Sequence, residues 1–325
     1  MIERHNKLIM DLIEDYPRAD LIQTPTIIHK LPRLSSYLGR SVYILREDLI
    51  GFALGGNKTR KVDYLLGDAM AKNADSLVTM KATSFSRNAA VAASACGLDF
   101  HVVLAGTESE QNPASQAIFK QCETKLHYVP EKKNSLQDVY NNLVSTLINQ
   151  GKSVYELHPG GSNSIGTLGY VRVFDEIIDY SYRSDIHFSQ IIHSTSSAGT
   201  QAGLVLGQCI SAYDTCIVGI SASLEADLQY ERIRKLALAT ADLLGVKLDE
   251  TKIIVDDEFV GSGYAVPSEE GKNAAKLFAT LEGVLLDQVY SGKAAGALLH
   301  HAKNGTLKEG NVLFIHTGGN AGLFY

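Results

Sequence analysis

The stretch GGNKTRK places Lys58 directly after Gly55, Gly56 and Asn57, at the start of a helical pattern. A neutral lysine amine is a nucleophile that forms a Schiff base with a carbonyl compound. A solvated surface charge is the commoner explanation of any single lysine. Lys58 is therefore a candidate nucleophile whose role depends on what the rest of the chain places beside it.

A second candidate is the loop STSSAGT, residues 194–200, which follows an apolar run and precedes a helical pattern. Backbone N–H groups at the start of a helix bind anions such as phosphate, and the hydroxyls of this loop add further donors. The alternative is a simple helix cap, because serine and threonine are preferred there. The loop is neither a Walker A sequence nor a G-x-G-x-x-G fingerprint, so the sequence leaves both possibilities open.

Three further loops carry polar side chains beside predicted strand or helix ends. The stretch DDEFVGSGYAVPSEEG contains Tyr264 and a helix start at which Ser268 is the expected cap. The stretch DQVYSGKAAG places Tyr290 and Ser291 before an alanine-rich helix, and HTGG places Thr317 after a strand. Any one tyrosine is more often a packing residue than a catalytic one, so each remains a candidate only.

The segment KATSFSRNAA, residues 81–90, joins an apolar run to an alanine-rich helical pattern. A chain that enters a helix there offers hydroxyls and backbone N–H groups to a ligand. The phenylalanine in its middle, Phe85, is unexpected among small polar neighbours. The segment is a further candidate for binding an anionic group.

These candidates need elements that position them, and the chain alternates short apolar runs with helical patterns. The runs are apolar on both faces, which is typical of buried parallel strands. The predicted strands cover residues 41–45, 76–80, 100–105, 125–129, 153–157, 190–195, 216–220, 252–256 and 311–316. The alternation predicts an open α/β fold with helices on both faces of its sheets.

The helix predicted after Lys58 has one apolar stripe with helical spacing. The stripe consists of Val62, Leu65, Leu66, Ala69 and Met70. In open parallel sheets, ligands bind at the carboxyl ends of the strands, where loops enter helices. That rule singles out the loops described above.

The number of predicted strands is large for a single sheet, so we expect two α/β domains. Glycine-rich stretches near residues 47–57 and 158–163 are the best candidates for chain crossings between them. We predict a larger, cofactor-binding domain formed by residues 1–50 and 162–325. Residues 51–161 would form the smaller α/β domain.

Composition excludes several classes of protein. The 325 residues are 45% hydrophobic and 20% charged, and the net charge of -6 predicts no basic surface for nucleic acid. The first residues lack the apolar centre of a signal peptide, and no run approaches the ~20 apolar residues of a membrane span. The scattered cysteines predict buried, reduced thiols, and no histidine spacing indicates a metal site. We therefore expect no metal, no membrane contact and a cytoplasmic location.

Taken together, these motifs resemble the fold-type-II pyridoxal 5′-phosphate enzymes, in the branch of 1-aminocyclopropane-1-carboxylate deaminase and D-cysteine desulfhydrase. The resemblance runs nearly end to end and is carried by TPTIIHKLPRLS, GGNKTRK, HPGGSNSIGTLGYV, DDEFVGSGYAVPSEEG, VYSGK and HTGG. It implies two open, twisted parallel-sheet domains like those of the tryptophan synthase β-subunit. It also implies pyridoxal 5′-phosphate as cofactor, a small amino acid as substrate, and a homodimer.

The resemblance further implies a role for each candidate residue. Lys58 would be the Schiff-base lysine and the base that takes the α-proton. The implied catalytic residues are Lys58, Thr83, Tyr264 and Tyr290. The implied cofactor-binding residues are Lys58, Asn57, Ser84, Thr195, Ser196, Ser197, Ala198, Gly199, Thr200 and Thr317. The implied substrate-binding residues are Thr83, Ser84, Phe85, Gly161, Tyr264, Tyr290, Ser291 and Thr317.

Two positions divide this branch by substrate. The deaminases of the cyclopropane acid are similar to VYEGK and HLGG, whereas this chain has Ser291 and Thr317, the pattern of the desulfhydrases. A carboxylate near the pyridine nitrogen gives a stronger electron sink, which opening a ring without an α-proton requires. The resemblance therefore implies β-elimination from a D-cysteine-like amino acid to pyruvate, ammonia and sulfide. Deamination of the cyclopropane acid, cleavage of a sulfonated cysteine, and a binding protein without activity are the alternatives.

The chain departs from the family at two places. Thr83, Ser84 and Phe85 stand where the family has serine, asparagine and histidine, so Phe85 keeps an aromatic plane for stacking on the cofactor but loses polarity. Ser196 and Ala198 replace glycines of the phosphate loop, and glycine at positive φ is not exchanged freely. We expect a changed loop backbone or weaker cofactor binding there.

Overall fold

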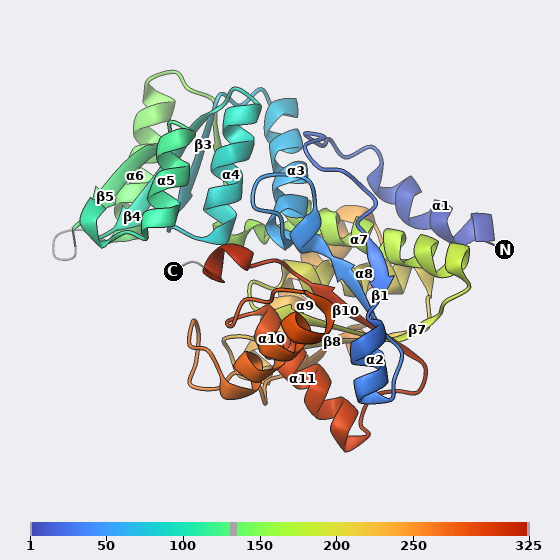
Figure 1. Cartoon of the computed structure of the whole chain (residues 1–325). Coiled ribbons are helices and arrows are strands. Elements are labelled where there is room, and N and C mark those ends of the chain that lie inside the picture. The colour runs from blue at the N-terminus through green and yellow to red at the C-terminus, as the bar shows by residue number, and fades with distance from the viewer. Residues whose placement is uncertain (1, 131–134, 324–325) are drawn as a thin grey trace.

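The computed structural model describes residues 2–130 and 135–323, which form two lobes built on two sheets (Figure 1). The larger sheet contains β1 (Ile28–Lys30), β2 (Val42–Arg46), β7 (Phe188–Thr195), β8 (Cys216–Ser221), β9 (Ile254–Asp256) and β10 (Asn311–His316). The smaller sheet contains β3 (Ser76–Met80), β4 (Asp99–Ala105), β5 (Lys125–Val129) and β6 (Val154–Glu156). Their strand orders are β1-β2-β10-β7-β8-β9 and β5-β4-β3-β6.

Every predicted strand is present, with small shifts at its ends, and the smaller sheet is parallel throughout. The expected two parallel-sheet domains are confirmed, and the larger sheet carries one unpredicted edge strand, β1, which pairs antiparallel with β2. Strand β1 is too short to give an apolar run in the sequence. Only α2 connects it to β2, and a short connection suits antiparallel pairing, since parallel strands need a longer crossover.

Helices cover both faces of the larger sheet, as the alternation predicts. Helices α1 (Ile2–Ile13), α7 (Ser164–Ser184), α8 (Gly199–Ser211) and α9 (Ala226–Leu244) pack on one face. Helices α2 (Pro32–Leu38), α10 (Glu269–Glu282) and α11 (Ser291–Asn304) pack on the other. The adjacent residues Ile191 and Ile192 of β7 point into these two opposite cores. Burial of each such side chain stabilises the fold by about 1.5–3 kcal/mol, so the strands are apolar on both faces.

The smaller sheet is flanked by α3 (Asn57–Ala71), α4 (Ser84–Ala95), α5 (Pro113–Gln121) and α6 (Leu136–Asn149). Short 3₁₀ turns are η1 (Glu47–Leu49), η2 (Glu108–Glu110), η3 (Pro159–Gly161), η4 (Glu250–Lys252) and η5 (Asn320–Leu323).

Helix α3 lies at the junction of the lobes and packs against both α4 and α7 (Figure 1). Its apolar stripe is fully buried except for Met70 at the end of the helix, which is 37% exposed. All strands between residues 76 and 156 belong to the smaller sheet, and the division at residues 51–161 stays a prediction.

Two further expectations concern burial. The cysteines are free thiols, but each is only partly buried, so the expectation of full burial is wrong. Across the described ranges, no helix has both the length and the apolar character needed to cross a membrane.

Candidate active site

Lys58 is the second residue of α3 and contacts the loop that follows β7. Its Nζ donates a hydrogen bond of 3.0 Å to Ser197 Oγ. Burial lowers the pKa of the Lys58 amine to about 8, so a nucleophilic neutral fraction exists near neutral pH. The structure therefore brings the candidate nucleophile against the candidate anion loop.

Asn57 fixes the backbone in front of this lysine. Its N–H donates to the Thr317 carbonyl at 2.9 Å, and its Nδ2 donates to Thr200 Oγ1 at 2.9 Å. Gly56 has φ 86°, and a Cβ there would lie 3.0 Å from the same Thr317 carbonyl oxygen. The glycine thus permits the close approach that lets Asn57 join the ends of β10 and α8.

Helix α8 begins at Gly199 without a side-chain cap among the described residues, so the simple-cap interpretation of this loop is wrong. Two of the loop hydroxyls are engaged elsewhere: Thr195 Oγ1 accepts from Gln229, and Ser196 Oγ bonds Ser223 Oγ at 3.2 Å. The N–H of Gly199 is used within the loop, but among the described residues those of Thr200 and Gln201 are left for another acceptor, an arrangement suited to phosphate.

Ala198 turns the chain into α8 with φ 71° and ψ −38°. The Gly199 N–H donates to the Ser197 carbonyl at 3.0 Å, which closes a γ-turn of the rare, strained type. The alanine thus keeps the positive φ that a glycine adopts freely, at a cost of about 1–3 kcal/mol. The substitution leaves the conformation glycine-like and strained.

A second lysine, Lys61, lies one turn along α3 and was not identified from the sequence. Its Nζ lies 3.4 Å from both the Gly160 carbonyl and Ser162 Oγ. A Cβ on Gly199 would lie 2.7 Å from this amine, so the amine fills the space beside the start of α8. The i, i+3 spacing from Lys58 places both amines on one face of the helix and is the signal that could have found it.

The two amines lie close enough for their charges to interact. Within the described ranges, neither has a carboxylate at ion-pair distance. Burial and the neighbouring Lys58 charge lower the pKa of Lys61 well below its usual value. A buried pair of this kind beside open N–H groups fits a ligand that carries both an aldehyde and a phosphate.

Lys58, Lys61 and the 194–200 loop form one wall of the candidate site, and the start of α4 forms a second. Thr83 caps the helix by accepting from the Ser86 N–H, and Ser86 Oγ accepts from the Thr83 N–H at 2.8 Å. This reciprocal capping box leaves the Thr83 hydroxyl proton available for a ligand. Asn88 Nδ2 donates to the Gly55 carbonyl at 3.0 Å, which fastens α4 to the loop before Lys58. Ser84, the first residue of the helix, is exposed.

Phe85 points away from this wall and into the core of the smaller domain. It is 1% exposed and packs in one cluster with Leu65. A Cβ on Gly161 would lie 2.6 Å from the Phe85 ring, so the ring covers the backbone of Gly161. This placement explains the aromatic residue by packing and lends no support to stacking on a ligand.

Tyr264 and Tyr290 form a third wall. Their hydroxyls are 2.7 Å apart and their rings meet edge to face. Tyr264 is 56% exposed. Burial raises the pKa of Tyr290, and the hydrogen bond with the Tyr264 hydroxyl raises it further. The Tyr290 hydroxyl is therefore protonated at neutral pH and able to donate.

Asp287 supports this wall and was also missed in the sequence. Its carboxylate accepts from the N–H groups of Val289, Tyr290 and Ser291, and the Ser291 hydroxyl donates to it at 2.5 Å. Aspartate is a preferred residue at helix starts, which is the only signal for it in the sequence. Because the Ser291 proton is committed to Asp287, the Ser291 oxygen can only accept from a further group.

The HTGG loop closes the ring of contacts between these walls. A Cβ on Gly318 would lie 2.5 Å from Gly56 Cα, and one on Gly319 would lie 2.6 Å from Asp287 Oδ1. Thr317, which precedes these two glycines, is buried. The structure thus joins the Lys58 loop, the anion loop, the start of α4 and the start of α11, but no direct contact joins the two tyrosines to Lys58 within the described residues.

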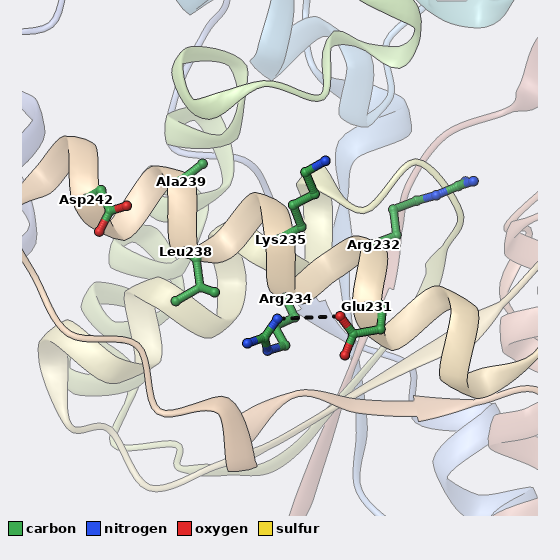
Figure 2. A pocket seen from close by; sticks show the side chains of 7 residues that line it. All are labelled: Glu231, Arg232, Arg234, Lys235, Leu238, Ala239 and Asp242. Atoms are coloured by element: carbon green, nitrogen blue, oxygen red, sulfur yellow. Dashed lines mark hydrogen bonds and ion pairs between the residues drawn. The ribbon is translucent and has the colours of Figure 1, made fainter.

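A hollow elsewhere on the surface lies along α9 (Figure 2). Glu231, Arg234 and Lys235 contribute charges of both signs to its lining, and Arg234 is paired with Glu231 and Glu250. Arg232 reaches the anion loop through a bond of 3.2 Å to the Ser196 carbonyl. The residues that line the hollow include no helix start, so we do not assign it to the candidate site.

Comparison with known proteins relates this geometry to one family. The family described as "Pyridoxal-phosphate dependent enzyme" matches residues 19–318. The D-cysteine desulfhydrase of Serratia proteamaculans is 36% identical over 324 residues, which cover 96% of each chain. A crystal structure described as an ACC deaminase homologue is 36% identical, with a TM-score of 0.87 over 97% of this chain and 95% of that one. The serine racemase of Dictyostelium discoideum shares the fold at 15% identity, with a TM-score of 0.69 over 98% of this chain and 97% of that one.

Proposed function

This chain belongs to the family of pyridoxal-phosphate dependent enzymes, and on that premise we propose that it deaminates a small amino acid by β-elimination, with D-cysteine as the first candidate. The observation that carries the proposal is the contact between Lys58 Nζ and Ser197 Oγ beside the uncapped start of α8. It supports a covalent ligand site and a phosphate site within reach of each other.

The cofactor would be held by residues from both lobes. Lys58 would hold its aldehyde carbon, and Lys61, Ser197 and the first N–H groups of α8 would hold its phosphate. When bound, pyridoxal phosphate supplies a ring that withdraws electrons from the Cα of an attached amino acid. The residues of this chain must then orient the substrate and move its protons.

Lys58 is the proposed base that takes the proton from the substrate Cα. Its lowered pKa supports this role, because a base must be neutral before it accepts a proton. Thr83 and the first N–H groups of α4 would hold the substrate carboxylate, since they start a helix and the Thr83 proton is not used in the cap. Ser84 would flank the same group.

The tyrosine pair is proposed to serve the leaving group. The two hydroxyls share one hydrogen bond and carry two protons, so one proton is directed outward from the pair. That proton can stabilise a departing thiolate and then neutralise it. Ser291 and Thr317 are neutral side chains, which suits a substrate with an acidic α-hydrogen and a good leaving group.

In the proposed reaction, D-cysteine and water yield pyruvate, ammonia and hydrogen sulfide. The test is turnover of purified enzyme loaded with pyridoxal phosphate, followed by sulfide and pyruvate assays over a panel of D- and L-amino acids. We expect sulfide from D-cysteine, and loss of both the visible absorption band and turnover in Lys58→Ala. Formation of 2-oxobutanoate from the cyclopropane acid without sulfide would instead assign the deaminase activity.

The alternative to this activity is a protein that binds the cofactor without catalysis. The buried placement of Phe85 in place of a polar residue is the observation that favours a non-catalytic binding protein, which predicts an absorption band but no turnover of any amino acid.

We also propose a homodimer in the cytoplasm, as the resemblance to the family implies. Light scattering of the loaded protein tests the dimer.

A further inference from the structure

Lys293, on α11, is fully buried and directs its ammonium at backbone carbonyls. Its Nζ donates to the carbonyls of Val260 at 2.7 Å, Gly263 at 3.0 Å and Ala222 at 3.3 Å. In the part of the chain that the structure describes, no carboxylate lies within ion-pair distance of this amine. A buried lysine is rarely left without a paired anion, so its surroundings call for a reason.

The three carbonyls belong to segments that carry the proposed site. Val260 and Gly263 bracket the start of the loop that holds Tyr264. Ala222 precedes Ser223, whose hydroxyl bonds Ser196 of the anion loop. Lys293 itself lies two residues beyond Ser291. One ammonium therefore connects the tyrosine loop, α11 and the neighbourhood of the phosphate site.

In the tyrosine loop, residues 257–266, the described backbone hydrogen bonds are weak. Gly261, Gly263 and Ala265 adopt positive φ, and the backbone bonds within the loop are long, at 3.2 Å for Val260 N–H to Asp257 and 3.4 Å for Val266 N–H to Gly263. Carbonyl oxygens that converge on one point repel one another unless a cation lies between them. Proteins bind alkali metal ions with such rings of carbonyls.

We propose that the Lys293 ammonium is a built-in cation that takes the place of an alkali metal ion and positions Tyr264 against Tyr290. The covalent tether makes this cation permanent, so the loop is held without any dependence on the ions in solution. Lys293 is a positioning residue, because its ammonium bonds backbone carbonyls and acts through the loop. The structural part of this inference is independent of the reaction, and its kinetic part rests on the proposed function.

The structural test compares two variants of the full chain by thermal unfolding in potassium, sodium and choline chloride at equal ionic strength. Lys293→Ala leaves room for an ion, and we expect potassium to raise its Tm in a saturable way above the value in choline. Lys293→Met fills the same space without a charge, so we expect a lowered Tm that potassium does not restore. Wild-type protein and Lys272→Ala, an exposed lysine on α10, should show no ion-specific change.

An equal response of both Lys293 variants to potassium and choline would overturn the proposal. Lys293→Gln keeps two N–H donors without a charge and provides the same decision if the other variants do not fold. An unchanged Tm in that variant would show that hydrogen bonds without a positive charge hold the loop, which would also overturn the proposal.

The kinetic test measures elimination from D-cysteine by Lys293→Met. We expect KM to rise about tenfold while the absorption band of the loaded enzyme is kept, because the cofactor residues are intact. An unchanged KM would contradict the positioning role. If wild-type enzyme turns over no amino acid, the proposed function fails, and the melting experiment still decides the role of Lys293.

Discussion

At the residue scale, Lys58 sets the pH dependence of cofactor binding. Burial lowers the pKa of its amine to about 8, so about a tenth of it is neutral at pH 7, and only the neutral form attacks an aldehyde. The rate of pyridoxal phosphate addition to the apoprotein should rise up to about pH 8 and then level off. Stopped-flow absorbance measures this rate. The control is a lysine ester acetylated at its α-amine, whose free side-chain amine should react at a rate that still rises beyond pH 10.

The same shift has a defined sign for stability. Between about pH 8 and 10 the unfolded chain binds more protons at this position than the folded chain, so the contribution of Lys58 to stability increases with pH there. A midpoint of the addition rate near pH 10 would contradict the buried, perturbed amine.

Lys61 should recognise the phosphate and nothing else. Replacing it by methionine removes a charge-assisted hydrogen bond of about 1.5–3 kcal/mol, so affinity for pyridoxal phosphate should fall about 10- to 100-fold. Affinity for pyridoxal, which lacks the phosphate, should stay the same in equilibrium titrations. Lys72→Met, at the exposed end of α3, is the control. Equal weakening of both ligands would assign Lys61 to general packing.

Ala198 stores strain that glycine would release. We expect Ala198→Gly to stabilise the protein by about 1 kcal/mol, because relief of about 1–3 kcal/mol exceeds the entropic cost of glycine. Urea unfolding measures the change. Ala239→Gly, in the exposed interior of α9, should have the opposite sign at about 1 kcal/mol. Destabilisation by both substitutions would show that the γ-turn is not strained.

At the element scale, the start of α4 combines a cap with a proposed ligand contact. Thr83→Ala should lower the free energy of unfolding by about 1 kcal/mol through loss of the cap and should also raise KM for the amino acid. Thr83→Ser keeps the hydroxyl and should restore both quantities, as measured by urea unfolding and steady-state kinetics. A variant that loses stability with an unchanged KM would limit Thr83 to its structural role.

Elements with a strong local pattern were predictable, and those fixed by tertiary contacts were not. Strands such as β10 are apolar at successive positions, from Val312 to Ile315, and Ser268 caps α10 as expected because the cap depends on residues close in sequence. Strand β1 exists only through its pairing with β2, so its own residues carry little signal. The direction of Phe85 likewise depends on Gly161, which lies far away in the sequence.

At the scale of the whole molecule, a buried ion network joins distant parts of the chain. Arg60 on α3 contacts Glu47 and Glu176 and bonds Thr26, and the side chains of Arg60 and Glu47 are fully buried. Burial raises the pKa of Glu47, which the arginine opposes. The network ties α3 to α7 and to the segment after β2.

Breaking this network should be costly. Arg60→Met leaves two carboxylates buried without their partner, so the free energy of unfolding should fall by about 3–5 kcal/mol. Urea unfolding is the measurement, and Arg234→Met, which removes a partly exposed pair on α9, should change stability by no more than about 1 kcal/mol. Similar losses in both variants would contradict a special role for the buried network.

The site as a whole was predictable only where one motif carried it. Lys58 could be recognised by the glycines before it and the 194–200 loop by its hydroxyls, and the fold brings the two together as expected. Asp287 and Lys293 serve through backbone groups of other segments, and no local pattern reveals which carbonyls or N–H groups a side chain will meet.

The double attachment of Asn57 has a consequence for motion. Through it, the reactive amine is fastened to the carboxyl ends of neighbouring strands in the six-stranded sheet, whereas Thr83 starts a helix packed on the four-stranded sheet. Asn88 of α4 also bonds the Gly55 carbonyl, two residues before Asn57. A rotation of one lobe against the other would therefore have to break the bonds of Asn57 or that of Asn88, so these two amides keep the reactive amine at a set distance from both the phosphate cradle and Thr83.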